Sequence, residues 1–267
     1  MTSASSAASP LDGNWHLTGN REQKEFPLIS MFVHVEGTQV YGSAASKNVC
    51  SNAGGGFEAR FQLAGEIGQN GEFTLDTLPF GHHPILKIAG KVPRAGEMSW
   101  NGNYTIKSSS QSQCVFDQVG TFIASPLRSI SGTFSGQVTR MYPYPVPRTA
   151  STDYINKTPM RLKLSLTVEQ GSFAFYQEKN GPRYAYLPLT GTINTVGCAC
   201  FSHGIASNEV SNRVQGDVVA MKFKMDDESE LWVQSYHGTA EASLAFRSHV
   251  VGGKCEGLGF DGTLLRQ

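Results

Sequence analysis

Apolar and polar residues alternate with a period of two along most of the chain. The clearest segments are residues 29–42 (ISMFVHVEGTQVYG) and 162–176 (LKLSLTVEQGSFAFY). This period places successive side chains on opposite faces of an extended strand. Most of these segments end quickly at Gly, Asn-Gly, Pro or Ser, residues that favour turns. The pattern predicts an all-β protein of many short strands with little helix.

Two Asn-Gly pairs mark expected hairpins between alternating segments. One lies in residues 68–73 (GQNGEF) and the other in residues 178–184 (EKNGPRY). Asn-Gly is the strongest short-range signal for a two-residue hairpin turn. Short strands joined by frequent turns favour an antiparallel up-and-down β-barrel or a barrel-like sandwich, because closure removes exposed strand edges.

The same order of features occurs twice. Residues 11–15 (LDGNW) and 130–134 (ISGTF) both run apolar, small polar, Gly, polar, aromatic. Each is followed by a strand in which Val-Glu precedes a turn glycine, at residues 35–37 and 168–171. Further matches in the same order indicate a tandem duplication of one barrel domain.

The duplication predicts the domain boundaries. We expect a disordered N-terminal tether at residues 1–10, a first barrel at residues 11–127 and a second barrel at residues 128–267. Whether the two repeats close as separate barrels or share one continuous sheet stays open at this stage.

The cysteines follow the same repeat. They are Cys50, Cys114, Cys198, Cys200 and Cys255. None forms the Cys-x-x-Cys pattern typical of zinc sites and thioredoxin-like redox sites. In the repeat, Cys50 corresponds to Cys198 or Cys200, and Cys114 corresponds to Cys255. We therefore predict the disulfides Cys50–Cys114 and Cys198 or Cys200–Cys255, with one thiol left over.

Composition and charge narrow the class of protein. The formal net charge is zero and only 16% of residues are charged, so no basic field exists to gather nucleic acid. Residues 2–9 are small and polar, and such Ser/Ala tethers resemble the mature start of exported bacterial lipoproteins. That resemblance and the cysteine pairs predict an exported protein, periplasmic or anchored to the outer membrane through an N-terminal lipid. The alternative is the frayed terminus of a cytosolic protein.

Residues 11–106 resemble the calycin and avidin type of barrel. Gly13-Asn14-Trp15 matches the Gly-x-Trp that opens the first strand in those families. Residues 100–104 (WNGNY) match their late Trp-x-Gly-x-Tyr strand, while the second repeat has Phe134 and Phe246 at the corresponding places. The resemblance implies an up-and-down barrel. It implies no biotin site, since the polar residues of such a site have no individual match.

Aromatic residues are the candidate ligand contacts. They are Trp15, Trp100, Tyr104, Tyr142, Tyr144 and Trp232. The tryptophans lie in expected strands, where they would either fill a barrel interior or stack on a sugar or flat apolar molecule at the barrel mouth. Tyr142 and Tyr144 belong to a Pro-rich insertion at residues 141–154, which forms either a binding rim or a rigid strap.

No catalytic, metal or cofactor motif stands out. Gly-x-Ser-x-Gly and the phosphate-binding glycine patterns are absent. His82 and His83 are adjacent, so on an extended backbone their side chains point apart. The acidic residues 226–228 and Glu230 suit a solvated hairpin tip better than a calcium site. We expect no metal and no cofactor.

The expected function is non-catalytic. The sequence favours a cell-envelope module that binds a small molecule, a glycan or a protein partner. Two alternatives stay open: an envelope hydrolase with a carboxylate pair between the repeats, and a purely structural envelope protein.

Overall fold

The structure is a computed structural model of the 267-residue chain, and it describes residues 9–20, 26–46, 59–78, 85–107, 117–141, 151–177, 182–237 and 243–267. Strands dominate these residues, and the helix α1 (Thr152–Lys157) spans six of them. The predicted all-β class is confirmed.

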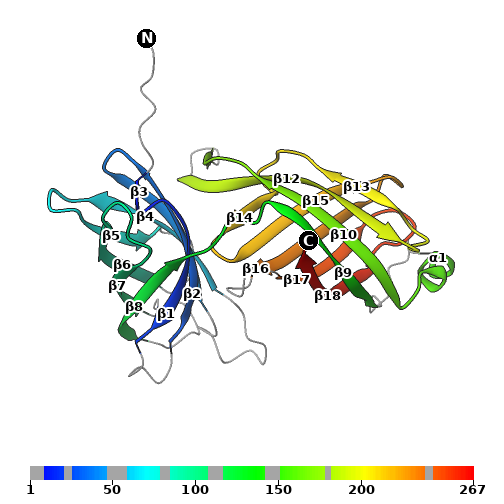
Figure 1. The fold of residues 1–267 in the computed structure, drawn as a ribbon, viewed down its shortest axis with the longest axis horizontal. Coiled ribbons are helices and arrows are strands. Elements are labelled where there is room, and N and C mark those ends of the chain that lie inside the picture. Colours follow the sequence, from blue (N-terminus) through cyan, green and yellow to red (C-terminus); the bar gives the residue numbers. More distant parts are fainter. Residues whose placement is uncertain are drawn as a thin grey trace, which may run out of the picture. The chain divides into compact units, whose positions relative to one another are not determined.

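The first repeat forms a closed antiparallel barrel (Figure 1). Its strands are β1 (Gly13–Gly19), β2 (Leu28–Glu36), β3 (Gln39–Ser46), β4 (Ala59–Ile67), β5 (Glu72–Thr77), β6 (Ile85–Lys91), β7 (Trp100–Lys107) and β8 (Gln118–Pro126). Each strand pairs with the next, and β8 returns to pair with β1. The Asn-Gly at residues 68–73 joins β4 to β5, as predicted.

The second repeat forms a barrel of its own. Its strands are β9 (Gly132–Met141), β10 (Arg161–Gln170), β12 (Arg183–Val196), β13 (His203–Ala206), β15 (Val218–Met225), β16 (Glu230–His237), β17 (Ser243–Val251) and β18 (Gly259–Arg266). The barrel closes because β10 pairs with both β9 and β12, while β18 pairs with β9. Strand β11 (Ala174–Gln177) extends beyond β12, and β14 (Arg213–Gln215) pairs with β12 and β15. Two tandem up-and-down barrels are thus present.

Aromatic side chains pack the interior of the first barrel. The ring of Trp100 has Trp15, Phe73 and Phe122 edge-on around it, at centroid distances of 5.9, 5.4 and 5.2 Å. The indole N–H of Trp15 donates to the Leu11 carbonyl oxygen at 3.0 Å. Edge-to-face aromatic packing of this kind fills a core at close range.

The second barrel repeats this arrangement with smaller rings. Phe134 and Phe246 occupy the positions in the second repeat that correspond to Trp15 and Trp100 in the first, and both are 1% exposed. A close backbone approach also recurs. A Cβ on Gly42 would lie 2.7 Å from a carbonyl oxygen of β2, and one on Gly191 would lie 2.2 Å from the carbonyl oxygen of Thr167. Only glycine fits at either position, as expected of duplicated strands.

Contacts divide the chain into two compact units. Unit 1 is Met1–Leu127 with Phe175–Ala185 and Gln215–Asp217, and unit 2 is the remainder. Within unit 1, Met31 points into the barrel core, while Ser30 on the other face of β2 is also fully buried and contacts the added segment Gln215–Asp217. The Asp217 backbone N–H donates to Ser30 Oγ at 3.1 Å on this outer face.

The structure decides between the two candidate cysteine pairings. Cys200 forms the disulfide with Cys255, with Cα atoms 6.1 Å apart, and Cys198 is a free, half-buried thiol. The Cys198–Cys200 segment follows the end of β12 rather than lying in a strand, because Gly197 turns the chain at φ 89°. Cys50 and Cys114 lie outside the described residues, so their predicted disulfide stays a prediction.

Among the described residues, no helix has both the length and the apolar composition needed to cross a membrane. In that same part of the chain, no three His, Cys, Asp or Glu side chains gather as metal ligands would.

The acidic residues before β16 accept hydrogen bonds from nearby backbone groups. Asp226 accepts from the Ser202 and His203 backbone N–H groups at 3.1 and 3.2 Å, and Asp227 accepts from the Ser229 N–H at 3.1 Å. His82 and His83 lie outside the described residues.

Candidate functional site

The aromatic candidates do not come together in one place. Trp15, Trp100 and Tyr104 are buried in the first barrel, with only 4%, 4% and 3% of their surfaces exposed. Burial also raises the pKa of the Tyr104 phenol. These three residues build the core. Tyr142 and Tyr144 lie outside the described residues.

Trp232 is different, because it lies on the outer face of the second barrel. Its side chain is 45% exposed. From the sequence, we expect Trp232 either in a barrel interior or at a barrel mouth. Strand β16 alternates, so Leu231 and Val233 point inward at 0% and 4% exposed while Trp232 and Gln234 point outward. Leu231, Val233 and Ser235 therefore face the core of the barrel, and Trp232 faces solvent.

Hydrogen bonds and ring contacts hold the Trp232 indole in place. Its Nε1 donates to Glu230 Oε2 at 2.9 Å. Lys222 Nζ lies 3.3 Å from Glu230 Oε1, and the His249 ring lies 5.9 Å from the indole, tilted by 42°. We call Lys222, Glu230, Trp232, Gln234 and His249 the Trp232 face.

Strand pairing sets this arrangement. Trp232 pairs with Lys222 on β15 and with His249 on β17, so the three side chains form one cross-strand row on the outer face. Glu230 and Gln234 flank Trp232 two residues away on the same strand, where side chains share a face. The face is therefore carried by three paired strands and by no loop.

The charges of the face are mutually stabilised. The hydrogen bond from Trp232, followed by the contacts with Lys222, lowers the pKa of Glu230. Hydrogen bonds to Glu230 and Glu209 raise the pKa of Lys222. Hydrogen bonds from Ser207 and then Lys222 lower the pKa of Glu209. Glu230 and Lys222 of the face, and the neighbouring Glu209, are therefore charged at neutral pH.

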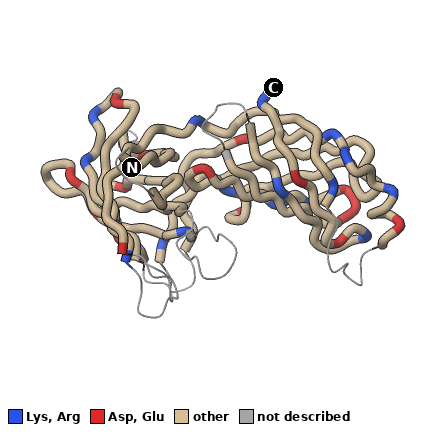
Figure 2. The backbone as a smooth tube through the Cα atoms, turned by 90° about the horizontal axis from the view of Figure 1, so that it is seen from below, with Lys and Arg blue, Asp and Glu red and all other residues tan. Residues whose placement is uncertain are grey.

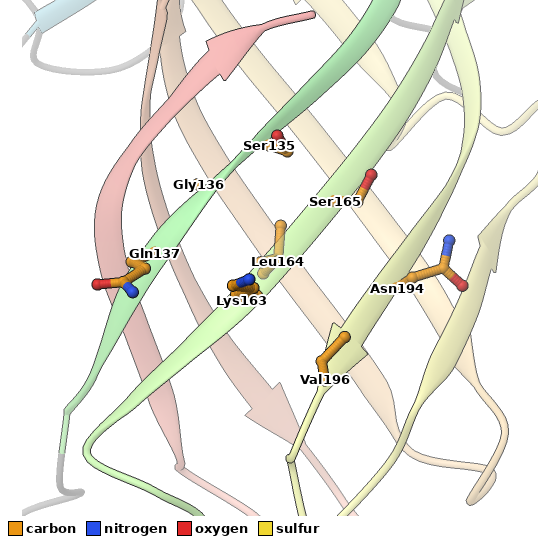
Figure 3. A pocket seen from close by; sticks show the side chains of 8 residues that line it. All are labelled: Ser135, Gly136, Gln137, Lys163, Leu164, Ser165, Asn194 and Val196. Atoms are coloured by element: carbon orange, nitrogen blue, oxygen red, sulfur yellow. The ribbon is translucent and has the colours of Figure 1, made fainter.

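A second feature is a shallow groove on the outside of β9, β10 and β12, drawn in Figure 3. It has a volume of about 430 Å³. Its lining residues are Ser135, Gly136, Gln137, Lys163, Leu164, Ser165, Asn194 and Val196. We call it the β10 groove. Sequence reasoning missed it, because scattered Ser, Gly, Gln and Lys residues form no motif, and the groove exists only once the strands are paired.

Comparison with models of known protein families finds no match for this chain, and comparison with curated proteins finds no similar sequence. Along the part of the backbone that the structure describes, acidic and basic residues are interspersed (Figure 2). That distribution agrees with the formal net charge of zero.

Proposed function

We propose that this protein is a non-catalytic binding module of the cell envelope, and that its Trp232 face binds a glycan. The observation that carries the proposal is the position of Trp232. A large aromatic ring is 45% exposed and is held by a hydrogen bond to Glu230, while the other two tryptophans are buried.

The face has the chemistry that sugars require. A sugar ring presents an apolar C–H face, which packs well on an exposed indole, and hydroxyl groups around its edge. The ionised Glu230 accepts hydrogen bonds from such hydroxyls, and Lys222 and His249 supply donors beside the ring. The indole loses little freedom on binding, because Glu230 and the strand pairing already orient it.

The location in the envelope rests on the cysteines. A buried disulfide such as Cys200–Cys255 persists in oxidising compartments, whereas the cytosol keeps thiols reduced. Export agrees with the Ser/Ala tether at residues 2–9. Attachment through a lipid at the N-terminus is part of the proposal.

The charges of the Trp232 face argue against hydrolysis there. Glu209 and Glu230 both lie within 3.4 Å of Lys222 Nζ, so they share one cation. The pKa of each carboxyl is lowered. A glycosidase needs one carboxyl with a raised pKa to act as the general acid. The face is suited to holding a sugar and not to cleaving it.

Tryptophan fluorescence provides the test. Neutral cello-oligosaccharides and chito-oligosaccharides are titrated into the intact protein, and the emission of the exposed Trp232 reports binding. We expect Trp232→Ala to weaken binding of the recognised sugar about tenfold, equivalent to about 1.4 kcal/mol, as measured by calorimetry. The matched control is Ile205→Ala, which removes a 56% exposed apolar residue from β13 and should leave affinity unchanged.

Two results would contradict the proposal. One is the absence of saturable binding by every sugar of both series. The other is equal affinity in the natural protein and in the Trp232→Ala variant, which would remove the Trp232 face from any glycan site that the protein has.

A further inference from the structure

We propose that the β10 groove is a second, separate binding site and that its ligand is a sugar acid, a polyhydroxylated molecule that carries a carboxylate. The groove lies on other strands than the Trp232 face, and the inference does not depend on the proposed function. Its evidence is the shape of the groove, the state of its polar side chains and its charge.

Small residues produce the hollow. Ser135, Ser165 and Asn194 are paired across β9, β10 and β12 and form one outer row, in which the first two residues are short. The neighbouring row consists of Gln137, Lys163 and Val196, and the side chains of Gln137 and Lys163 are longer than those of the serines. The serine positions therefore form a depression beside this row. Figure 3 shows Gln137 and Asn194 at the two sides, with Ser135, Lys163 and Ser165 between them. The volume of about 430 Å³ falls in the range of small-molecule sites.

Three polar side chains of the groove are not used by the protein. Within the described part of the chain, the side chains of Ser135, Lys163 and Ser165 make no hydrogen bond or ion pair. One row away the hydroxyls of Thr133 and Thr167 lie 3.2 Å apart and satisfy each other. The hydroxyls of Ser135 and Ser165 therefore remain available to hydrogen-bond water or a ligand that replaces water.

The charge of the groove selects the ligand. Lys163 is the one ionisable residue among the eight that line the groove, and no carboxylate is among them. An ammonium group with no neutralising partner in the described residues attracts an anion. Asn194 adds an oriented amide, since its Oδ1 lies 2.9 Å from His203 Nδ1. A molecule with one carboxylate and several hydroxyls matches this set.

An apolar patch completes the match to a sugar. Val196 is 69% exposed, and the methylene stem of Lys163 lies in the same row. Together they offer a surface for the C–H face of a ring, while the serine hydroxyls and the amide meet its edge.

The strand pairing excludes an extended peptide as the ligand. A peptide strand binds a sheet by hydrogen bonding to an unpaired edge. Here β10 is paired on both sides, with β9 through Arg161–Val168 and with β12 through Lys163–Gln170. No backbone groups of β10 are free along the groove, so recognition there depends on side chains.

The experiment uses the intact protein and four probes: glucuronate, galacturonate and the neutral sugars glucose and galactose. Binding is measured by calorimetry, and the bound region is mapped by amide chemical-shift changes. We expect one of the acids to bind, with shifts confined to β9, β10 and β12, and its neutral counterpart to bind at least about tenfold more weakly. Added salt should weaken the binding, because the Lys163 site is open to solvent.

Variants locate the site. Lys163→Gln should weaken binding of the acid about tenfold, while Lys224→Gln, which removes an exposed lysine from β15, should leave it unchanged. Ser165→Phe should abolish binding by filling the groove. The proposal is overturned if neither acid binds saturably, or if binding survives both Lys163→Gln and Ser165→Phe. Trp232→Ala should leave this binding intact, so failure here is distinguishable from failure of the Trp232 face.

Discussion

Cys200 and Cys255 join the loop after β12 to the loop after β17 and close 55 residues of chain between them. Thr158 supports the bridge, because its Oγ1 lies 3.5 Å from Cys200 Sγ and accepts from the Ala199 N–H at 3.1 Å. Cys255 is fully buried. The disulfide therefore ties together two loops at one end of the second barrel.

Loss of this disulfide should destabilise the second barrel. In the chain-entropy model, a bridge that closes 55 residues contributes about 4 kcal/mol. We expect Cys255→Ser to lower the free energy of unfolding by about that amount in urea denaturation. Cys198→Ser is the matched control and should change stability by less than about 1 kcal/mol.

Peptide mapping without reductant tests the pairing directly. Cys198 should be alkylated before reduction, and a peptide linking Cys200 to Cys255 should be recovered. A linked Cys198–Cys255 peptide would contradict the structure. The same map tests the predicted Cys50–Cys114 bridge, which free thiols at both positions would disprove.

The close approach at Gly191 should tolerate no side chain. A Cβ there would lie 2.2 Å from the Thr167 carbonyl oxygen, so the paired strands would have to separate. We expect Gly191→Ala to cost about 3 kcal/mol, at the upper end of overpacking effects. Gly68→Ala is the control, since its Cβ would meet nothing closer than 3.5 Å. Thermal unfolding of both variants is the measurement, and equal midpoints would contradict the prediction.

Two buried hydroxyls in the second barrel should respond in opposite ways to removal. Ser235 Oγ is buried and has no hydrogen-bond partner among the described residues, so Ser235→Ala should be neutral or should stabilise by up to about 1 kcal/mol. Thr195 Oγ1 donates to the Phe201 carbonyl oxygen at 2.8 Å. Thr195→Val leaves that oxygen unpaired and should cost about 1–3 kcal/mol. Urea denaturation measures both, and a costly Ser235→Ala would reveal a hidden partner.

The Trp232 face should respond to acid because of Glu230. Its pKa is lowered by the Trp232 hydrogen bond and by Lys222, so its stabilising contacts are complete above the ordinary glutamate pKa of about 4.3 and are lost as pH falls through the lower folded value. Trp232 fluorescence should change as pH falls below the ordinary glutamate pKa of about 4.3. Glu230→Gln should lack this transition, and a persistent transition in that variant would assign it to another group.

Much of the fold could be read from the order of residues. Period-two alternation determined the strands, and Asn-Gly determined the turn between β4 and β5. The repeated Gly-x-aromatic openings and the repeated Cys spacing indicated two barrels, and they identified Cys255 as one half of a disulfide. These features are local or recur along the chain, so they are visible without knowledge of which strands meet in space.

Tertiary structure decided the surfaces. Alternation shows that Trp232 and Leu231 lie on opposite faces of one strand, but both faces of residues 230–237 (ELWVQSYH) contain apolar residues, and only barrel closure selects Leu231 for the core. The choice of Cys200 over Cys198 required the turn at Gly197. The β10 groove depends on the register that sets Ser135 beside Ser165, thirty positions away in the chain. Which side chains are buried, which cysteine forms the disulfide and where the surface is hollow all depend on how the strands pair. No single segment of the sequence therefore determines them.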